Sequence, residues 1–263
     1  MSRKVIQRSI IIIIFALLIL MPLAVIVFLS VGQQWHYPRL FPGSLDWGYY
    51  FRQLTTNVEL LSSLRASLLL AGGTIILTLV IAYPTAIALA YYTFPGKRLF
   101  SVCVYLPLIV PGIALLTNID FMMIKYSLTG TFFGVICVHT LFCLPYAVKL
   151  LVDNLVLLKN RYEVTGRNLG ASPWQTFFKI TLPLSKPGLQ GALMMTYIVS
   201  MTQYLATLMV GNGNYLTLSV RMFPFTQEGK YQIAAVYGVT FMLVTLVPLF
   251  ILDSLLNRQR KRG

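Results

Sequence analysis

Apolar residues dominate six long stretches of the chain, and shorter polar segments separate them. A helix needs about 20 mostly apolar residues to cross the hydrocarbon core of a bilayer. Each stretch meets that requirement and predicts one membrane-spanning helix. We therefore expect an all-α membrane protein with six transmembrane helices, in a single transmembrane domain over residues 1–263. The predicted spans are residues 9–31, 66–92, 99–121, 131–152, 189–210 and 232–256.

The first stretch also has one feature of a signal peptide, because Arg3, Lys4 and Arg8 precede its apolar run. The run is longer than the apolar core of a signal peptide, and no small-x-small cleavage site follows it. We therefore expect this segment to remain in the protein as a span.

The composition indicates a lipid environment. The chain is 57% hydrophobic and 11% charged, whereas a soluble domain usually carries about a quarter charged residues. Too few charges remain to cover a surface in water, so the exterior is expected to face lipid. Cys103, Cys137 and Cys143 lie inside apolar runs and are expected to be buried. An odd number of such cysteines favours apolar packing over a disulfide framework or a metal site, so no metal is predicted.

Lysine and arginine are distributed unevenly between the connections, and this distribution predicts the orientation. With the N-terminus inside, 15 of the 21 cations fall in cytoplasmic segments and 6 fall outside. Both termini and the loop 153–188 are therefore expected in the cytoplasm. The same distribution explains the net charge of +14 without a nucleic-acid partner.

The loop 153–188 is the longest polar stretch of the chain, and a long loop in a compact protein is usually functional. Asn160 and Glu163 match a capping box, which predicts that a short helix starts there. Gly170 is placed to end that helix in a left-handed conformation. One face of the helix carries large residues at its ends and small residues between them, namely Tyr162, Thr165, Gly166 and Leu169.

A second short helix is expected to begin at Ser172. Pro173 suits the first helical position, and Gln175 completes a capping box with Ser172. Prolines at 183 and 187 are expected to break this helix before the fifth span. One face is predicted to hold Trp174, Phe177, Phe178 and Thr181. The pattern allows two interpretations: a docking element for a soluble partner, or an amphipathic loop that rests on lipid headgroups.

The residues of this loop resemble a known family. Gly170, followed after nine residues by Ile180-Thr181-Leu182-Pro183, is similar to the signature of the permease subunits of binding-protein-dependent ABC importers. The Asp46-Trp47 pair and the stretch Cys137–Tyr146 are similar to the spermidine/putrescine-like branch of that family.

The chain departs from the family signature at one point. The Glu-Ala-Ala positions of the signature fall on Val164, Thr165 and Gly166, whereas Glu163 lies one residue earlier. One residue corresponds to a rotation of about 100° around a helix. The role of the family glutamate therefore does not carry over directly to Glu163, which the local pattern predicts as a helix cap.

The resemblance implies a type I-like permease with cytoplasmic coupling helices in the bacterial inner membrane. Such a subunit forms the path for a small polar solute that an external binding protein delivers. Its implied partners are ABC ATPase subunits, a second permease subunit that is homologous or identical, and membrane lipid. The implied ATPase-coupling residues are Tyr162, Glu163, Val164, Thr165, Gly166, Arg167, Leu169, Gly170, Ala171, Ser172, Pro173, Phe177 and Pro183.

Catalytic motifs are missing from the sequence. It has no G-x-x-x-x-G-K-[ST] phosphate loop and no H-E-x-x-H motif. We expect a non-catalytic transport subunit without a cofactor of its own, with ATP and Mg bound by the partner ATPase. The alternative is a self-contained secondary transporter or channel, which would place ionisable groups at the bilayer midplane. Candidate residues for the substrate path are Tyr83, Pro107, Pro111, His139, Pro145 and Gln203.

Overall fold

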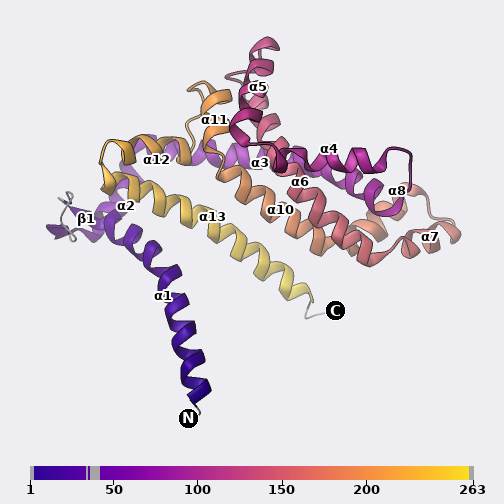
Figure 1. The fold of residues 1–263 in the computed structure, drawn as a ribbon, viewed down its shortest axis with the longest axis horizontal. Coiled ribbons are helices and arrows are strands. Elements are labelled where there is room, and N and C mark those ends of the chain that lie inside the picture. The colour runs from indigo at the N-terminus through magenta and orange to yellow at the C-terminus, as the bar shows by residue number, and fades with distance from the viewer. Residues whose placement is uncertain (1–2, 34, 36–41, 261–263) are drawn as a thin grey trace. The chain divides into compact units, whose positions relative to one another are not determined.

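The computed structural model describes residues 3–33, 35 and 42–260, with side chains described at 8–33, 35, 42–252 and 254. Helices make up nearly all of this part of the chain (Figure 1), as the sequence predicts. A two-residue antiparallel ladder pairs β1 (Gly32–Gln33) with β2 (Ser44–Leu45). The helices are α1 (Arg3–Val31), α2 (Trp47–Thr56), α3 (Val58–Tyr91), α4 (Lys97–Ile109), α5 (Gly112–Lys125), α6 (Phe132–Leu158), α7 (Arg161–Asn168), α8 (Pro173–Thr176), η1 (Phe177–Thr181), α9 (Leu182–Leu184), α10 (Lys186–Met201), α11 (Tyr204–Gly211), α12 (Leu218–Gln227) and α13 (Tyr231–Arg260).

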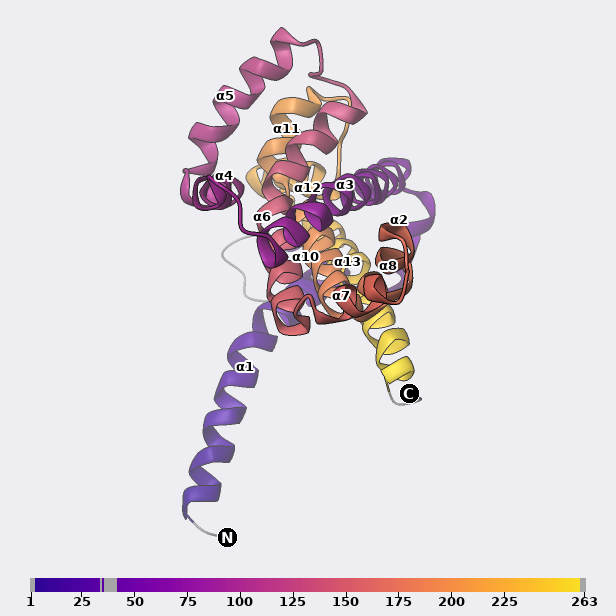
Figure 2. The same cartoon turned by 90° about the vertical axis from the view of Figure 1, so that its right-hand side faces the viewer.

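Four of the described helices, α1, α3, α6 and α13, are long and apolar enough to cross a membrane. The pair α4 and α5 is bent by 105° and the pair α10 and α11 by 62°, and counting each pair as one span brings the total to six. The third and fifth predicted spans, 99–121 and 189–210, are therefore each divided by a break. Figure 2 shows how α5 turns away from α4.

Pro111 accounts for the first break. A proline disfavours the helical conformation of the residue before it, and Val110 is extended, with φ −75° and ψ 133°. By contrast, Pro84, Pro107 and Pro145 lie inside α3, α4 and α6, and these helices continue through them.

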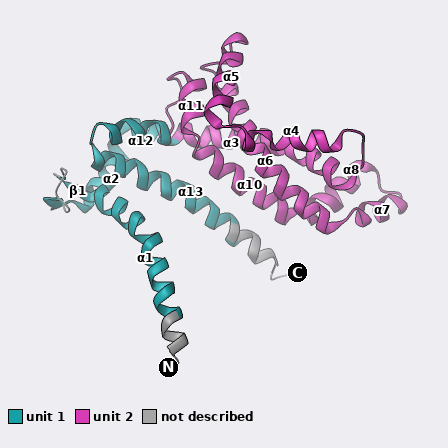
Figure 3. Cartoon of the chain, in the orientation of Figure 1, with its two compact units in different colours: residues 1–64, 218–263 teal, residues 65–217 magenta. Residues whose placement is uncertain are grey.

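Two compact units make up the chain (Figure 3): residues 65–217 form one, and residues 1–64 with 218–263 form the other. In residues 65–217, unit 2 of Figure 3, α10 packs along α6. Small residues at this contact, such as Ala147 and Ala192, are fully buried and let the helices approach closely. In the other unit α1 and α12 both pack on α13. The single-domain organisation stays a prediction.

Three of the cations counted for the orientation, Arg39, Lys261 and Arg262, lie outside the described residues. Of the cysteines, Cys143 is buried as expected, but Cys103 is exposed, so the expectation that all three are buried is wrong. Cys103 lies on α4, where only Val104 is buried, so most of that helix presents its side chains outward.

Candidate functional site

The first short helix of the loop 153–188, α7, begins where the sequence predicts, directly after Asn160. The predicted capping box is wrong, because the Asn160 side chain makes no cap hydrogen bond. The Glu163 carboxylate instead accepts a hydrogen bond of 2.6 Å from the hydroxyl of Thr181. Glu163 therefore connects α7 to the far end of the loop rather than to its own N-terminus.

Gly170 ends α7 as predicted. Its φ of +86° is left-handed, a conformation that glycine adopts without the steric cost of a Cβ. The Gly170 amide donates to the Arg167 carbonyl at 2.9 Å, and the Ala171 amide donates to the Gly166 carbonyl at 3.0 Å. These two bonds make a Schellman motif, which satisfies the last carbonyls of the helix and turns the chain toward α8.

The second short helix, α8, is capped as the sequence predicts. The Ser172 hydroxyl accepts from the Gln175 amide at 3.3 Å, and the Gln175 side chain accepts from the Ser172 amide at 3.0 Å. Pro173 occupies the first helical turn. The prolines that follow do not end the helical path at once, because η1 and α9 continue it to Ser185.

Gly166 faces the inside of the loop. A Cβ at this position would come within 2.6 Å of the Ile180 side chain and would also contact Thr176. The smallness of Gly166 therefore allows α7 to pack on the α8–η1 segment of its own chain. The prediction that Gly166 and Thr165 form a shared contact face for a partner is wrong for Gly166, although Thr165 is exposed.

The side of α7 opposite Gly166 is exposed. We name Arg161, Val164 and Asn168 the outer face of α7; they lie three and four residues apart and so share one side of the helix. All three are exposed, with Val164 at 48%. The Arg161 guanidinium lies 4.8 Å from the centre of the Tyr162 ring and donates to the Tyr162 hydroxyl at 3.0 Å. The outer face is therefore cationic and apolar.

The aromatic residues of the second helix divide between two sides. Trp174 and Phe178 are exposed and stack on each other with ring centres 6.0 Å apart. Phe177 instead turns inward, and its ring meets the edge of Tyr83 at 5.3 Å. Trp174 and Phe177 line one groove, whereas Phe178 is exposed and Thr181 is buried. The predicted common face of the four residues is therefore wrong, because the wider turn of the π-helix η1 changes which of its residues lie on one side.

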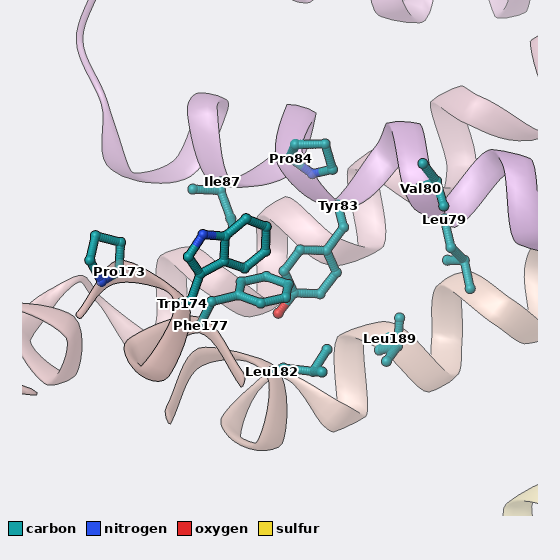
Figure 4. A pocket seen from close by; sticks show the side chains of 10 residues that line it. All are labelled: Leu79, Val80, Tyr83, Pro84, Ile87, Pro173, Trp174, Phe177, Leu182 and Leu189. Atoms are coloured by element: carbon teal, nitrogen blue, oxygen red, sulfur yellow. The ribbon is translucent and has the colours of Figure 1, made fainter. Parts of the chain in front are cut away.

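An apolar groove of about 720 Å³ lies between α3 and this part of the loop (Figure 4). Tyr83, Trp174 and Phe177 point into it from opposite walls. The Tyr83 hydroxyl is hydrogen-bonded to the hydroxyl of Ser185, which is fully buried. Tyr83 is therefore a contact between α3 and the loop.

His139 is buried inside the helices of unit 2, at 1% exposure. Its two ring nitrogens lie 3.0 Å from the Ser200 hydroxyl and 2.8 Å from the Thr207 hydroxyl. Thr207 also donates to the Gln203 carbonyl at 2.5 Å. His139 thus joins α6 to both sides of the break between α10 and α11, which is the role of a hydrogen-bonded interior histidine.

The structure does not bring the six predicted path residues into one site. His139 and Gln203 are linked through Thr207, Tyr83 contacts the loop, and Pro145 lines a separate cavity of about 520 Å³ with Tyr105. Pro107 lies within α4, and Pro111 directly precedes α5 as its N-cap residue.

The predicted coupling residues occupy one segment but differ in exposure. Gly166 is buried, and three of them are half-buried, namely Glu163, Ala171 and Phe177. The others are exposed: Tyr162, Val164, Thr165, Arg167, Leu169, Gly170, Ser172, Pro173 and Pro183.

The sequence reasoning missed four hydroxyl residues that complete these contacts. Ser185 lies four residues after Thr181, and Thr207 lies seven after Ser200. The first spacing places Thr181 and Ser185 on one helix face, a signal that could have identified Ser185. Ser200 and Thr207 lie on α10 and α11, on either side of a 62° bend, so their spacing carries no such signal.

Asp46 organises the connection before α2. Its carboxylate accepts from the Gly48 amide at 3.0 Å and from the Gln33 side chain at 3.0 Å, and it pairs with Arg52. The hydrogen bond from Arg52 is the main cause that lowers the pKa of Asp46 below its ordinary value. Trp47, the other residue of the predicted pair, is exposed.

Comparison with protein families identifies the class of this fold and loop. Residues 79–262 match the family described as "Binding-protein-dependent transport system inner membrane component". The match covers more than half of the chain, so the protein belongs to this family. It is a permease subunit of a binding-protein-dependent ABC importer and an inner-membrane component in bacteria. Members of this family are components of a multi-protein transport system, so the alternative of a self-contained transporter or channel is not supported.

Individual relatives support the same class. The chain is 25% identical over 260 residues to the spermidine/putrescine transport system permease protein PotC of Haemophilus influenzae, covering 98% of this chain and 99% of that protein. It is 29% identical over 198 residues to the Fe(3+)-transport system permease protein FbpB 2 of the same species. That alignment covers 74% of this chain but only 39% of the longer relative.

A solved structure has the same fold. It is the crystal structure of a bacterial ABC transporter involved in the import of the acidic polysaccharide alginate. The TM-score is 0.72 at 19% identity, and the match covers 98% of both chains.

Proposed function

We propose that this permease crosses the membrane six times, as one transmembrane domain with both termini in the cytoplasm. Each bent pair of helices then counts as one span, which agrees with the upper count of candidate spans. The orientation rests on the 15 cations that fall in inner segments. A single cysteine introduced at Ser172 should react only with a membrane-permeant reagent. Reaction with an impermeant reagent in intact cells would reverse the orientation.

The loop from 153 to 188 serves as the docking element for a separate ATPase subunit, which binds ATP and Mg. The single observation that carries this assignment is the inward position of Gly166 against Ile180. This packing, the Schellman motif at Gly170 and the capping box at Ser172 fix the loop as a preformed unit. A preformed element loses less conformational entropy when it binds a partner.

The outer face of α7 is the surface that meets the ATPase. Arg161, Val164 and Asn168 are exposed on the side opposite the loop's own packing. Leu169, at the end of the helix, is also exposed but lies on the side of Gly166 rather than on the outer face. Glu163, which the family signature would lead one to place on a docking surface, is instead bonded to Thr181 within the chain.

The test compares two exposed polar positions of the loop. Asn168→Phe adds volume on the outer face of α7, whereas Lys179→Phe adds the same side chain on η1. Because interfaces are packed as densely as protein interiors, Asn168→Phe should reduce copurification of the ATPase and its hydrolysis of ATP by about tenfold or more. Lys179→Phe should leave both near normal. Normal copurification in both variants would contradict docking through α7, and would favour a loop that rests on the membrane.

The complete importer contains a second permease subunit, an external binding protein and surrounding lipid. The length of one relative supports the pairing of two permease chains: 198 aligned residues make up 39% of FbpB 2, so that protein is roughly twice as long as this chain. The family description names a binding-protein-dependent system, which supports delivery by an external protein.

The cargo is a small polar solute. The names of the relatives specify iron and spermidine or putrescine, and these substrates share a polar character and small size. Transport in proteoliposomes, measured with the binding protein and with ATP, should distinguish the candidate solutes. Transport without ATP would contradict the proposed mechanism.

A further inference from the structure

Tyr83 of α3 makes the directional contact between that helix and the cytoplasmic loop. The residue is 6% exposed, its hydroxyl is bonded to Ser185, and its ring packs edge-on against Phe177. The other groove residues that α3 contributes are apolar, for example Leu79 and Ile87. Apolar contacts are non-directional, whereas a hydrogen bond requires a defined distance and angle. The hydrogen bond of the Tyr83 hydroxyl is therefore the contact that fixes the position of the loop relative to α3.

Ser185 lies at the junction between the loop and α10. Its amide donates to the Thr181 carbonyl at 2.9 Å, and its own carbonyl accepts from the Leu189 amide at 2.9 Å. Ser185 is thus held by helical hydrogen bonds on both sides and is fully buried. A residue fixed in this way moves together with the segment that contains it.

The same segment is tied to α7. The Thr181 hydroxyl, one turn before Ser185, donates to the Glu163 carboxylate. A continuous series of hydrogen-bonded residues therefore runs from α7 to α3, in the order Glu163, Thr181, Ser185 and Tyr83. The series crosses 102 residues of sequence in its last step, from Ser185 to Tyr83.

We infer that Tyr83 is the positioning residue through which movement of the coupling loop is passed to span α3. The inference rests on the proposed function, in which α7 docks the ATPase. When nucleotide binding displaces α7, the Glu163–Thr181 bond carries the displacement into η1 and Ser185. The Tyr83–Ser185 bond then transmits the displacement of Ser185 to α3. This role differs from the predicted place of Tyr83 on the substrate path.

The experiment measures the movement of α3 directly in the complex purified with its ATPase. Spin labels on cysteines introduced at Ile76 of α3 and Leu157 of α6, which are both exposed, report the distance between the helices. Cys103, Cys137 and Cys143 are replaced by alanine in the background. The distance distribution is recorded with and without ATP and vanadate, so the test needs no knowledge of the transported solute.

Three variants and one control are compared. Tyr83→Phe, Ser185→Ala and the double variant all remove the same bond, while Tyr91→Phe removes a hydroxyl from the same helix and leaves that bond intact. We expect the nucleotide-shifted fraction to fall roughly two- to tenfold in the first three, the factor that corresponds to one hydrogen bond. The double variant should match the single variants, because coupled groups are not additive. Tyr91→Phe should behave as the parent chain.

The outcomes separate this inference from docking itself. Normal ATPase copurification with a reduced shift in the three variants supports the inference. An unchanged shift in Tyr83→Phe overturns it while docking stands. Loss of copurification in Tyr83→Phe also overturns it, because the bond would then serve only to fold the loop. Additive losses in the double variant would show two independent effects and would equally contradict it.

Discussion

The loop 153–188 and the connection around Asp46 and α2 both contain a capped short helix. They differ in the burial of their side-chain hydrogen bonds. In the loop 153–188, which we propose to be cytoplasmic, the Tyr83–Ser185 bond is buried, and the buried Thr181 donates to the half-buried Glu163. In the connection before α2, Asp46 and Arg52 form their ion pair at the surface. Water can replace a lost partner at the surface but not in the interior, so removing a buried partner costs more. The comparison indicates that the cytoplasmic loop is built to keep one shape.

The largest effect is expected where the cytoplasmic loop is most tightly packed. Gly166→Phe would force a ring into the space that Ile180 occupies, and overpacking of this kind costs about 1–3 kcal/mol or more. Thermal unfolding of the purified permease should shift to lower temperature, and the ATPase should no longer copurify. Arg167→Phe is the matched control, since residue 167 is exposed, and it should leave unfolding unchanged. Equal stability of the two variants would mean that Gly166 does not pack inward.

A smaller effect is expected at the turn between the two short helices. Gly170→Val places a β-branched residue at φ +86°, which costs about 1–2 kcal/mol. Gly170→Asn should cost less, because asparagine adopts this conformation more readily. Copurification of the ATPase is the readout, and the ranking glycine, asparagine, valine is the expected order. A valine variant that docks as well as the asparagine variant would show that the turn does not position α7.

The smallest effect is expected in the connection before α2. Asp46→Asn keeps an N-cap of similar quality and loses the exposed charge pair with Arg52 and the carboxylate oxygen that accepts from Gln33. The pKa of Asp46 is lowered in the folded state, from an ordinary value of 3.8. The contribution of this pair is therefore fully present above that value and is lost as the pH falls through the folded pKa. Because an exposed pair contributes little, the unfolding temperature of the parent should exceed that of Asp46→Asn by only a small, constant amount between about pH 8 and pH 5. A large difference in unfolding temperature in that range would show that the exposed pair also contributes strongly, and would contradict the contrast drawn between the two connections.

Sequence reasoning succeeded where a structure depends on hydrogen bonds between near neighbours. The capping box of Ser172 and Gln175 and the left-handed Gly170 each involve residues within a few positions of one another. The composition likewise predicted the helical class, because a chain in lipid must satisfy its backbone groups internally.

The failures involve partners distant in sequence. Glu163 satisfies the pattern of a cap but bonds to Thr181, 18 residues away. A helical wheel identifies the residues that share a face with Gly166, but it does not say whether that face turns inward. The bend at Val110 and Pro111 has a visible proline, yet its angle of 105° depends on the packing of the helices that follow.

The central claim is that the outer face of α7 contacts the ATPase, and photo-crosslinking tests it most directly. A benzophenone amino acid is introduced at position 168 in one variant and at position 179 in another, and membranes that contain the assembled importer are irradiated. The account predicts an adduct between the permease and the ATPase from position 168 and none from position 179. Adducts with lipid alone from position 168, or ATPase adducts from position 179 only, would contradict it.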